Sequence, residues 1–281
     1  MLDYRTLDKL KINNSIKDIT SAHEGNMHTR SKGQSLEFSE YSSYEPRDDT
    51  RRIDWNIFAR TRKLYIKHYE AEKKLKANIF LDNSASMCAG DKNKLEKSVE
   101  IAKGLAYIAF NQGYEVHWHK NHLNKTLQSE IMRSKAQITK FELEESDLNK
   151  EEFLPKLLKS SVKRQELIII ISDCYTDKMS EIIKYFKYKK CKLILVYTLG
   201  QNEKEIPLTG NIKLRDSETD EEIRVEMNRN TRDLYLEKLR EHENALKNEI
   251  KKYGYKVVQP NLEKDIEYVF FQEFIKEGIL R

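Results

Sequence analysis

The apolar run LIIII at residues 167–171 constrains the fold of this chain more than any other feature. Every side chain in the run is apolar, so the strand that it predicts has no polar face. Such a strand fits the centre of a parallel sheet, because only there are both faces of a strand covered by helices. The chain must therefore supply helices for both sides of this strand.

Further short apolar segments alternate with helical periodicity along the chain. Strands are predicted at residues 78–82, 114–118, 192–198 and 255–259, in addition to 166–172. Between them, apolar residues recur at three- and four-residue steps, as helices packed on a sheet require. The groups are Leu95, Val99, Ala102, Leu105, Ala106 and Ala109, then Phe153, Leu154, Leu157 and Leu158, then Met179, Ile182, Ile183 and Phe186. This order predicts an α/β fold with a doubly wound, mostly parallel sheet and helices on both faces.

Two parts of the chain depart from this alternation. Residues 1–75 are rich in aromatic and charged side chains, and we interpret them as an N-terminal extension of an α/β domain at residues 76–281. The segment KLYIKHY at residues 63–69 is expected to begin a hairpin into the main sheet. Residues 211–227, NIKLRDSETDEEIRVEM, predict an inserted β-hairpin, which a long helix follows.

Composition excludes several classes of protein. The 51 Lys and Arg residues nearly balance the 46 Asp and Glu residues, so we expect no nucleic-acid partner. No segment approaches the roughly 18–20 apolar residues of a membrane span, so we expect none. The three cysteines are too few and too scattered for a disulfide framework, which points to a reducing compartment. The expected location is the cytoplasm.

The segment LDNSASM at residues 81–87 places Asp82, Ser84 and Ser86 directly after a predicted strand. A second strand ends in Ser172 and Asp173. Because ligands gather at the carboxyl ends of the strands of an open α/β sheet, these side chains are expected to meet at one edge. Carboxylates and hydroxyls are hard oxygen ligands, suited to Mg²⁺ or Mn²⁺ and less selectively to Ca²⁺. The pattern is compatible with a site for a divalent cation.

The same segment is also compatible with two roles that involve no metal. Asp82 and Ser84 are residue types that cap a following helix, and that role alone would account for them. A serine nucleophile is the weaker alternative, because the chain has no G-x-S-x-G elbow and no histidine marked as its base. The five-letter pattern by itself does not decide among metal site, cap and nucleophile.

The segment HWHKNH offers His117, His119 and His122 as an alternative zinc site, because alternate residues of a strand share a face. Histidines in this pattern more often face solvent, and Val116 and Trp118 would then take the buried side.

The run RTRKLYIKHYEAEKK at residues 60–74 is basic and aromatic, but its acidic residues fit a solvated strand edge better than a nucleic-acid interface. Just before it stand Arg51, Arg52, Asp54 and Trp55, with Arg60 at its start. Two interpretations of these residues are equally open. They form an internal network that fixes the N-terminal segment, or they form a surface for a partner.

The order of motifs along the chain resembles a known family. The segment LDNSASM, with SD after a later strand, resembles the metal-ion-dependent adhesion site of von Willebrand factor A domains. The upstream motifs resemble the bacterial proteins of domain-of-unknown-function family 58, often described as MoxR-associated. The matching residues are Glu37, Phe38, Tyr44, Asp48, Asp49, Arg52, Ile53, Asp54, Trp55, Ala59, Arg60, Thr61, Asp82, Ser84, Ser86 and Met87.

This resemblance implies a set of metal ligands. Ser84 and Ser86 would offer hydroxyl oxygens, while Asp82 and Asp173 would bind the ion directly or through water. Such sites usually include a threonine on an intermediate loop, and Ser146 in the tripeptide Ser-Asp-Leu is the candidate to replace it. Two residues depart from the family pattern: Arg47 stands where glycine is usual, and Ser42 where arginine is frequent.

The resemblance also implies a function without catalysis. A cation bound mainly by neutral hydroxyls keeps positive charge and an open position, which an acidic side chain of a partner protein can fill. The family implies a MoxR-type AAA+ ATPase as that partner, in the assembly or maturation of other proteins. A metal-dependent hydrolase and a scaffold with a vestigial site remain as alternatives.

Overall fold

The computed structural model describes residues 2–13, 36–46, 48–71, 75–88, 92–121, 127–143, 153–206, 209–217 and 220–281. The chain divides into two compact units. We call residues 1–19 and 75–281 the α/β unit, and residues 20–74 the hairpin unit.

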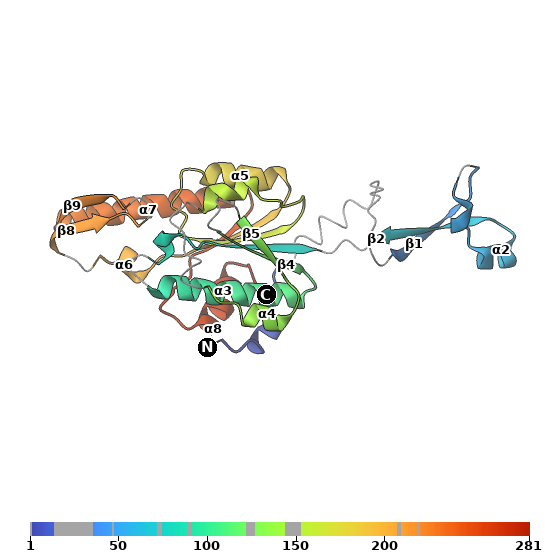
Figure 1. The fold of residues 1–281 in the computed structure, drawn as a ribbon, viewed down its shortest axis with the longest axis horizontal. Helices are drawn as coiled ribbons and strands as arrows, with labels where there is room; N and C mark the ends of the chain where they lie inside the picture. Colours follow the sequence, from blue (N-terminus) through green and yellow to red (C-terminus); the bar gives the residue numbers. More distant parts are fainter. Residues whose placement is uncertain are drawn as a thin grey trace. The chain divides into compact units, whose positions relative to one another are not determined.

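The α/β unit is built on a six-stranded sheet in the order β10-β7-β6-β3-β4-β5 (Figure 1). Its strands are β3 (Lys76–Leu81), β4 (Glu115–Asn121), β5 (Leu127–Met132), β6 (Leu167–Ser172), β7 (Lys192–Tyr197) and β10 (Lys256–Val258). All neighbouring pairs are parallel except β4 and β5. The five predicted strands are all present, and the prediction of a mainly parallel sheet is confirmed.

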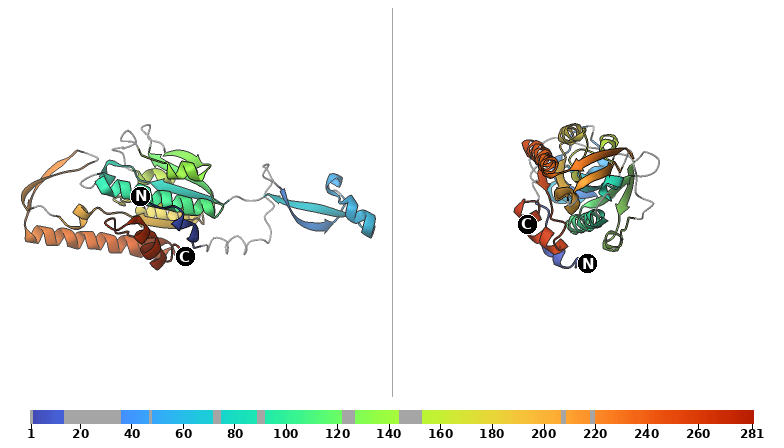
Figure 2. Two further views of the ribbon diagram at one scale, coloured as in Figure 1. Left: turned by 90° about the horizontal axis from the view of Figure 1, so that it is seen from below. Right: turned by 90° about the vertical axis from the view of Figure 1, so that its left-hand side faces the viewer.

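Helices cover both faces of this sheet (Figures 1 and 2). One face carries α3 (Lys92–Asn111), α4 (Lys135–Thr139) and α8 (Ile266–Tyr268), which continues as the π-helical turn η6 (Val269–Phe274). The other face carries α5 (Met179–Tyr188) and α7 (Arg229–Lys252). Strand β6 contributes to both cores, because Ile169 and Ile171 pack on the α3 side and Ile168 and Ile170 on the α5 side.

Short elements complete the α/β unit. They are the 3-10 turns η1 (Thr6–Lys9), η3 (Ala85–Met87) and η5 (Leu154–Lys159), the helix α6 (Gln201–Lys204), and the strands β8 (Gly210–Arg215) and β9 (Glu222–Met227). Strands β8 and β9 pair in the expected antiparallel hairpin directly before α7. Among the helices of the described residues, none is long and apolar enough to cross a membrane.

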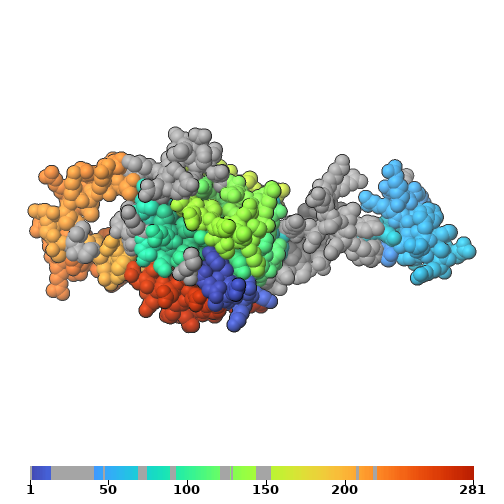
Figure 3. Space-filling model, turned by 60° about the horizontal axis from the view of Figure 1, so that its bottom comes forward, coloured from blue at the N-terminus to red at the C-terminus, as the bar shows by residue number. Residues whose placement is uncertain are grey.

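The first residues of the chain pack in the α/β unit, although the sequence analysis assigned residues 1–75 to one extension. Leu7 and Ile12 are buried in the core under α3. The amide of Lys11 donates to Arg281 O, and Arg281 N donates back to Lys11 O, so the N-terminal residues pair with the end of the chain. Figure 3 shows the N-terminal segment (dark blue) lying against the C-terminal one (red). Burial of these apolar side chains accounts for the difference.

The hairpin unit is a two-stranded antiparallel sheet of β1 (Leu36–Ser43) and β2 (Tyr65–Ala71), joined through η2 (Thr50–Arg52) and α2 (Trp55–Thr61). The expected hairpin into the main sheet is wrong, because β2 pairs with β1 instead. Asp54 begins α2 by accepting hydrogen bonds from Asn56 N and Ile57 N. Ile53 bridges to Ile66, and both side chains are buried.

Candidate functional site

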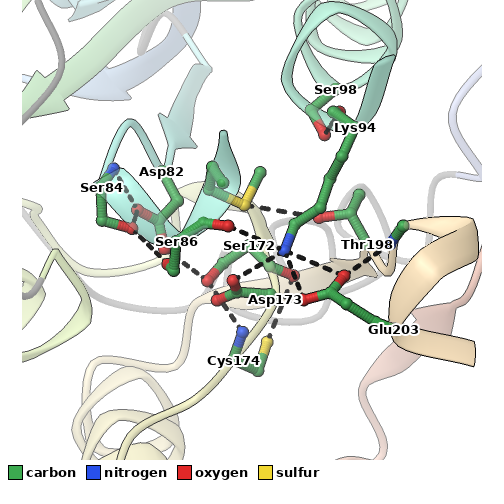
Figure 4. A network of polar contacts seen from close by, with 12 residues as sticks. Asp82, Ser84, Ser86, Lys94, Ser98, Ser172, Asp173, Cys174, Thr198 and Glu203 are labelled. Atoms are coloured by element: carbon green, nitrogen blue, oxygen red, sulfur yellow. Dashed lines mark hydrogen bonds and ion pairs between the residues drawn. The ribbon is translucent and has the colours of Figure 1, made fainter. Parts of the chain in front are cut away.

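The loop after β3 is organised around the carboxylate of Asp82 (Figure 4). The backbone amide of Asp82 donates a hydrogen bond to Ile171 O, which extends the pairing of β3 with β6 by one residue. Asp82 Oδ1 accepts hydrogen bonds from Ser84 N at 2.9 Å and Ser84 Oγ at 2.6 Å. Ser172 Oγ donates to Asp82 Oδ2 at 2.6 Å. Both carboxylate oxygens are therefore fixed by neighbours from the ends of two adjacent strands.

The two serines of the loop lie side by side. Ser84 Oγ is 3.0 Å from Ser86 Oγ. Ser84 precedes η3 but its hydroxyl caps no helix, and α3 starts only at Lys92. The interpretation of Asp82 and Ser84 as caps of the following helix is therefore wrong, since their side chains bond each other across the turn instead.

On the other side of the loop, a buried ammonium group joins three segments of the chain (Figure 4). Lys94 Nζ donates to Asp173 Oδ2 at 2.9 Å and to Ser86 O at 3.2 Å. It also lies 3.0 and 3.1 Å from the two carboxylate oxygens of Glu203 in α6. The side chain of Lys94 is 0% exposed and that of Asp173 is 4% exposed. This ion-pair network fixes the position of Asp173.

Lys94 and Glu203 were not predicted from the sequence. A signal for Lys94 was available, because residues 94, 98, 101 and 105 form one helical stripe. All four of these side chains, Lys94, Ser98, Ile101 and Leu105, are fully buried on α3. Glu203 lies three residues after Gly200 and accepts a hydrogen bond from its amide, as in a capping box. Neither signal shows that the two side chains meet.

Asp82, Ser84, Ser86 and Asp173 line one small pocket at the carboxyl ends of β3 and β6. This edge of the sheet is where the sequence placed them. The remaining lining residues are Phe153, Leu154, Pro155, Tyr175 and Thr176. Ser146, the fifth predicted ligand, lies outside the described residues.

The two carboxyl groups of the pocket differ in their partners. Lys94 faces Asp173, whereas hydroxyl and amide groups hold Asp82. Burial, and then the negative charge of Asp173, raise the pKa of Asp82 to about 6. Burial lowers the pKa of Lys94, but the charges of Asp173 and Glu203 outweigh burial and hold that pKa above its usual value. The pocket thus holds more negative charge than the ammonium group compensates.

This donor set suits a hard cation in its chemistry. Two carboxylates and two hydroxyls converge, and a divalent ion would offset the burial and the repulsion from Asp173 that raise the pKa of Asp82. Within the described part of the chain, there is no group of three or more His, Cys, Asp or Glu side chains that could hold a metal ion. A cation here would therefore depend on the serine hydroxyls.

Among the described residues, the histidine segment forms no group of three or more His, Cys, Asp or Glu side chains that could hold a metal ion. His119 is buried rather than solvent-facing as expected, and its Nε2–H donates to Asn78 Oδ1 at 2.9 Å. Its ring stacks on Phe80 with centroids 4.3 Å apart. His117 Nε2 lies 2.6 Å from Glu115 Oε1. His122 lies outside the described residues.

Fold and pocket together define a mixed α/β protein with a cluster of oxygen donors at the carboxyl edge of its sheet. The family model described as "Protein of unknown function DUF58" matches residues 40–245. The chain belongs to this family, as its motifs predicted.

The curated relatives include uncharacterized proteins of Mycobacterium bovis and Mycobacterium tuberculosis. Each is 31% identical over 81 residues, which is 29% of this chain. The match spans 26% of the length of each relative.

Two solved structures from Bacteroides are similar at low identity. One is an aerotolerance-related membrane protein of Bacteroides fragilis, 16% identical, covering 72% of this chain and 99% of that one, with a TM-score of 0.40. The other is the conserved hypothetical protein BatB of Bacteroides thetaiotaomicron, 16% identical, covering 73% and 98%, with a TM-score of 0.38. Likenesses of this size support no functional conclusion.

Proposed function

We propose that the chain is a non-enzymatic protein-interaction module of the von Willebrand factor A type. It binds an acidic group of a partner protein through a divalent cation at a site of the metal-ion-dependent adhesion type. The observation that carries the proposal is the convergence of Asp82, Ser84, Ser86 and Asp173 on one pocket. An antiparallel edge strand on an otherwise parallel sheet agrees with that domain type.

Each side chain of the pocket has a part in this mechanism. Ser84 and Ser86 offer neutral hydroxyl oxygens to the ion. The hydroxyls of Ser84 and Ser172 orient Asp82, and Lys94 orients Asp173. Ser146 is the proposed fifth ligand. A bound Mg²⁺, Mn²⁺ or Ca²⁺ would supply an open coordination position for the partner's carboxylate.

Binding is favoured over hydrolysis by the groups that line the pocket. Among the described lining residues there is no imidazole, and both carboxylates already accept hydrogen bonds from Lys94 or from hydroxyls. A hydrolase would need one of them, or another group, to accept a proton from water.

The family resemblance further suggests a MoxR-type AAA+ ATPase as the partner, and assembly or maturation of other proteins as the process. Cys88, Cys174 and Cys191 form no disulfide in the structure, which agrees with a reducing compartment, and we place the protein in the cytoplasm. A direct test is capture of purified ATPase by the wild type with Mg²⁺ present. Capture should fail in a chelator and in the double variant Ser84→Ala with Ser86→Ala.

The first experiment is a thermal melt of chelated protein with Mg²⁺, Mn²⁺ or Ca²⁺ added back. An ion at about 100 times its dissociation constant adds roughly 2.7 kcal/mol of stability, which raises Tm by several degrees. The double variant Ser84→Ala with Ser86→Ala should lose this rise. Ser98→Ala is the matched control, since Ser98 is also buried but donates to Lys94 O and does not line the pocket.

Two results would contradict the metal site. One is a wild-type melt that no ion shifts. The other is a rise in Tm that is equally large in the double variant, since the ion would then be held elsewhere.

A further inference from the structure

In the hairpin unit, the motif Arg-Ile-Asp-Trp at residues 52–55 has two buried and two exposed residues. Ile53 and Asp54 are buried, at 8% and 4% exposure. Asp54 accepts a hydrogen bond from Tyr41 Oη at 2.9 Å and pairs with Lys67 at 3.0 Å. Arg52 and Trp55, which flank this buried pair, are exposed. The internal network, one of the two interpretations that the sequence left open, therefore accounts for Asp54. Arg51, Arg52, Trp55 and Arg60, the other residues of that interpretation, are exposed.

The outer half of α2 presents a large aromatic side chain. Trp55 is 61% exposed, whereas the other tryptophan of the chain, Trp118, is 1% exposed. Arg60 is exposed as well, while Ile57 and Phe58 are half-buried on the inner side. Phe58 supports the indole edge to face, with ring centroids 5.9 Å apart. The indole is thus held in place while most of its surface faces solvent.

Basic residues lie on both sides of Trp55 in the sequence. Arg52 precedes α2, Arg60 lies within it, and Arg62 and Lys63 follow its end. All four are exposed, and none of them forms an ion pair with another described residue. We call these four residues and Trp55 the basic α2 surface.

The nearby carboxylates are engaged locally. Asp49 accepts from Arg51 N and lies 3.8 Å from Arg51 Nε. Asp48 accepts from Glu45 N, and Asp54 is buried. The positive charge of the basic α2 surface therefore lacks a counterpart among the described residues of its own unit.

We propose that the basic α2 surface is a docking site for an acidic protein segment, in which carboxylates flank an apolar side chain that packs on Trp55. Tryptophan and arginine dominate the binding energy of protein interfaces, and guanidinium groups pair with carboxylates in two-point geometry. This site needs no metal ion, so it is independent of the function proposed for the pocket at Asp82.

The surface suits a protein segment better than nucleic acid or a membrane. A nucleic-acid site would extend positive charge along a backbone track, but two exposed acidic residues, Asp48 and Asp49, stand close before the basic residues of this segment in the sequence. A membrane-surface helix would need a continuous apolar face, and the outer half of α2 offers only Trp55 and Ala59.

The test is a selection of ligands from a random library of 12-residue peptides displayed on phage. The full chain is the target, in a chelating buffer, and a Trp55→Ala, Arg60→Glu variant removes unrelated binders. The enriched sequences should share Asp or Glu around an apolar or aromatic residue. One such peptide should bind Trp55→Ala about tenfold or more weakly than wild type in fluorescence polarisation.

Controls separate this site from other surfaces. Arg60→Glu alone should also weaken the peptide, and added salt should weaken it further. Tyr188→Ala removes another aromatic side chain, 80% exposed on α5, and should leave affinity unchanged. Ser84→Ala with Ser86→Ala should also leave it unchanged, so this proposal and the proposed metal site fail by different measurements.

Several outcomes would overturn the proposal. They are no enrichment, enriched peptides without acidic residues, or binding that Trp55→Ala does not alter. Competition for the peptide by a 12-nucleotide oligothymidylate, or by vesicles with 30% phosphatidylserine, would assign the surface to another class of partner.

Discussion

The two units of this chain both keep a charged side chain from water, but they satisfy it differently. In the α/β unit, Lys94 is fully buried and its carboxylate partners stand 79 and 109 residues away in the chain. In the hairpin unit, the groups that contact the Asp54 carboxylate, from Tyr41, Asn56, Ile57 and Lys67, lie within 13 residues of it. Lys94 therefore depends on the complete fold, whereas Asp54 depends only on its own hairpin.

This difference extends to how each unit is held together. The α/β unit has a separate apolar core on each face of its sheet. In the hairpin unit, the only buried side chains among those described are Ile53, Asp54 and Ile66. A two-stranded sheet with so few buried groups is marginal by itself. We therefore expect substitutions at buried charges to act globally in one unit and locally in the other.

The substitution Lys94→Met tests the global half of this comparison and should have the largest effect. It leaves Asp173 buried without its counter-charge, and breaking one side of a buried pair costs about 3–5 kcal/mol. The free energy of unfolding is measured by urea denaturation in a Trp55→Phe background. There the fluorescence of buried Trp118 reports on the α/β unit alone.

Lys97→Met is the matched control for Lys94→Met. Lys97 lies one turn away on α3, is 24% exposed, and pairs with Glu100 at 3.6 Å. Such a surface pair contributes less than about 1 kcal/mol. If the two variants lose equal stability, the buried ammonium has no special role and the comparison fails.

Acid should weaken the α/β unit through His119. Burial, and then the charge of His117, lower the pKa of His119 to about 3. The unfolded chain, with a histidine pKa of about 6.5, therefore takes up the proton more readily than the folded chain. Neutral His119 contributes fully to stability above the unfolded pKa of about 6.5, and this contribution is lost as pH falls towards 3. Between pH 7 and pH 5 this amounts to about 2 kcal/mol.

Urea denaturation at the two pH values measures this effect. His119→Gln keeps a side-chain donor near Asn78 but no longer titrates, so between pH 7 and pH 5 the wild type should lose about 2 kcal/mol relative to this variant. The raised pKa of Asp82 opposes the loss equally in both proteins and cancels in the difference. His117→Gln is the control and should keep most of the wild-type dependence, because it leaves His119 buried and burial is the larger cause of its lowered pKa. An unchanged slope in His119→Gln would show that another group causes the acid sensitivity.

The contrast between local and distant partners also explains what the sequence could predict. The fully apolar run of β6 identifies a central strand without reference to any partner, and both of its faces are buried. Asp82 and Asp173 were placed together by a general rule for the carboxyl ends of parallel strands, and they line one pocket.

Other features depend on contacts that no short segment reveals. Strand β5 was missed because LQSEIM at residues 127–132 is a polar edge strand that takes its place by pairing with β4. Lys94 was missed because a lysine is assigned to solvent unless its acidic partners are known, and both lie far along the chain. Ser146 stays a prediction.

Asp54→Ala tests the local half of the comparison. It removes the acceptor for Asn56 N and Ile57 N and the partner of Lys67. Hydrogen exchange should show loss of amide protection in α2 and β2, with β6 unchanged. Asp48→Ala is the control, since Asp48 is exposed and accepts only from Glu45 N among the described residues. Loss of protection in β6 would mean that the two units unfold together.

The hairpin unit should also lose stability in acid, but in a lower range of pH than the α/β unit. The hydrogen bond from Lys67, followed by that from Tyr41, lowers the pKa of Asp54 to about 2. Its stabilising contribution is therefore present above the unfolded value near 4 and is lost only as pH falls towards 2. Protection of α2 should persist at pH 5, where His119 already weakens the α/β unit.

Trp55→Ala should have the smallest effect on stability, although it removes the largest side chain of α2. Trp55 is 61% exposed, and surface substitutions of this kind usually stay within about 0.5 kcal/mol. The same substitution at Trp118, which is 1% exposed and packs on Phe141, should cost about 3–5 kcal/mol. Urea denaturation followed by circular dichroism compares the two variants. A large loss of stability in Trp55→Ala would show that the indole belongs to the internal network of the hairpin unit. The argument for a docking surface would then fail.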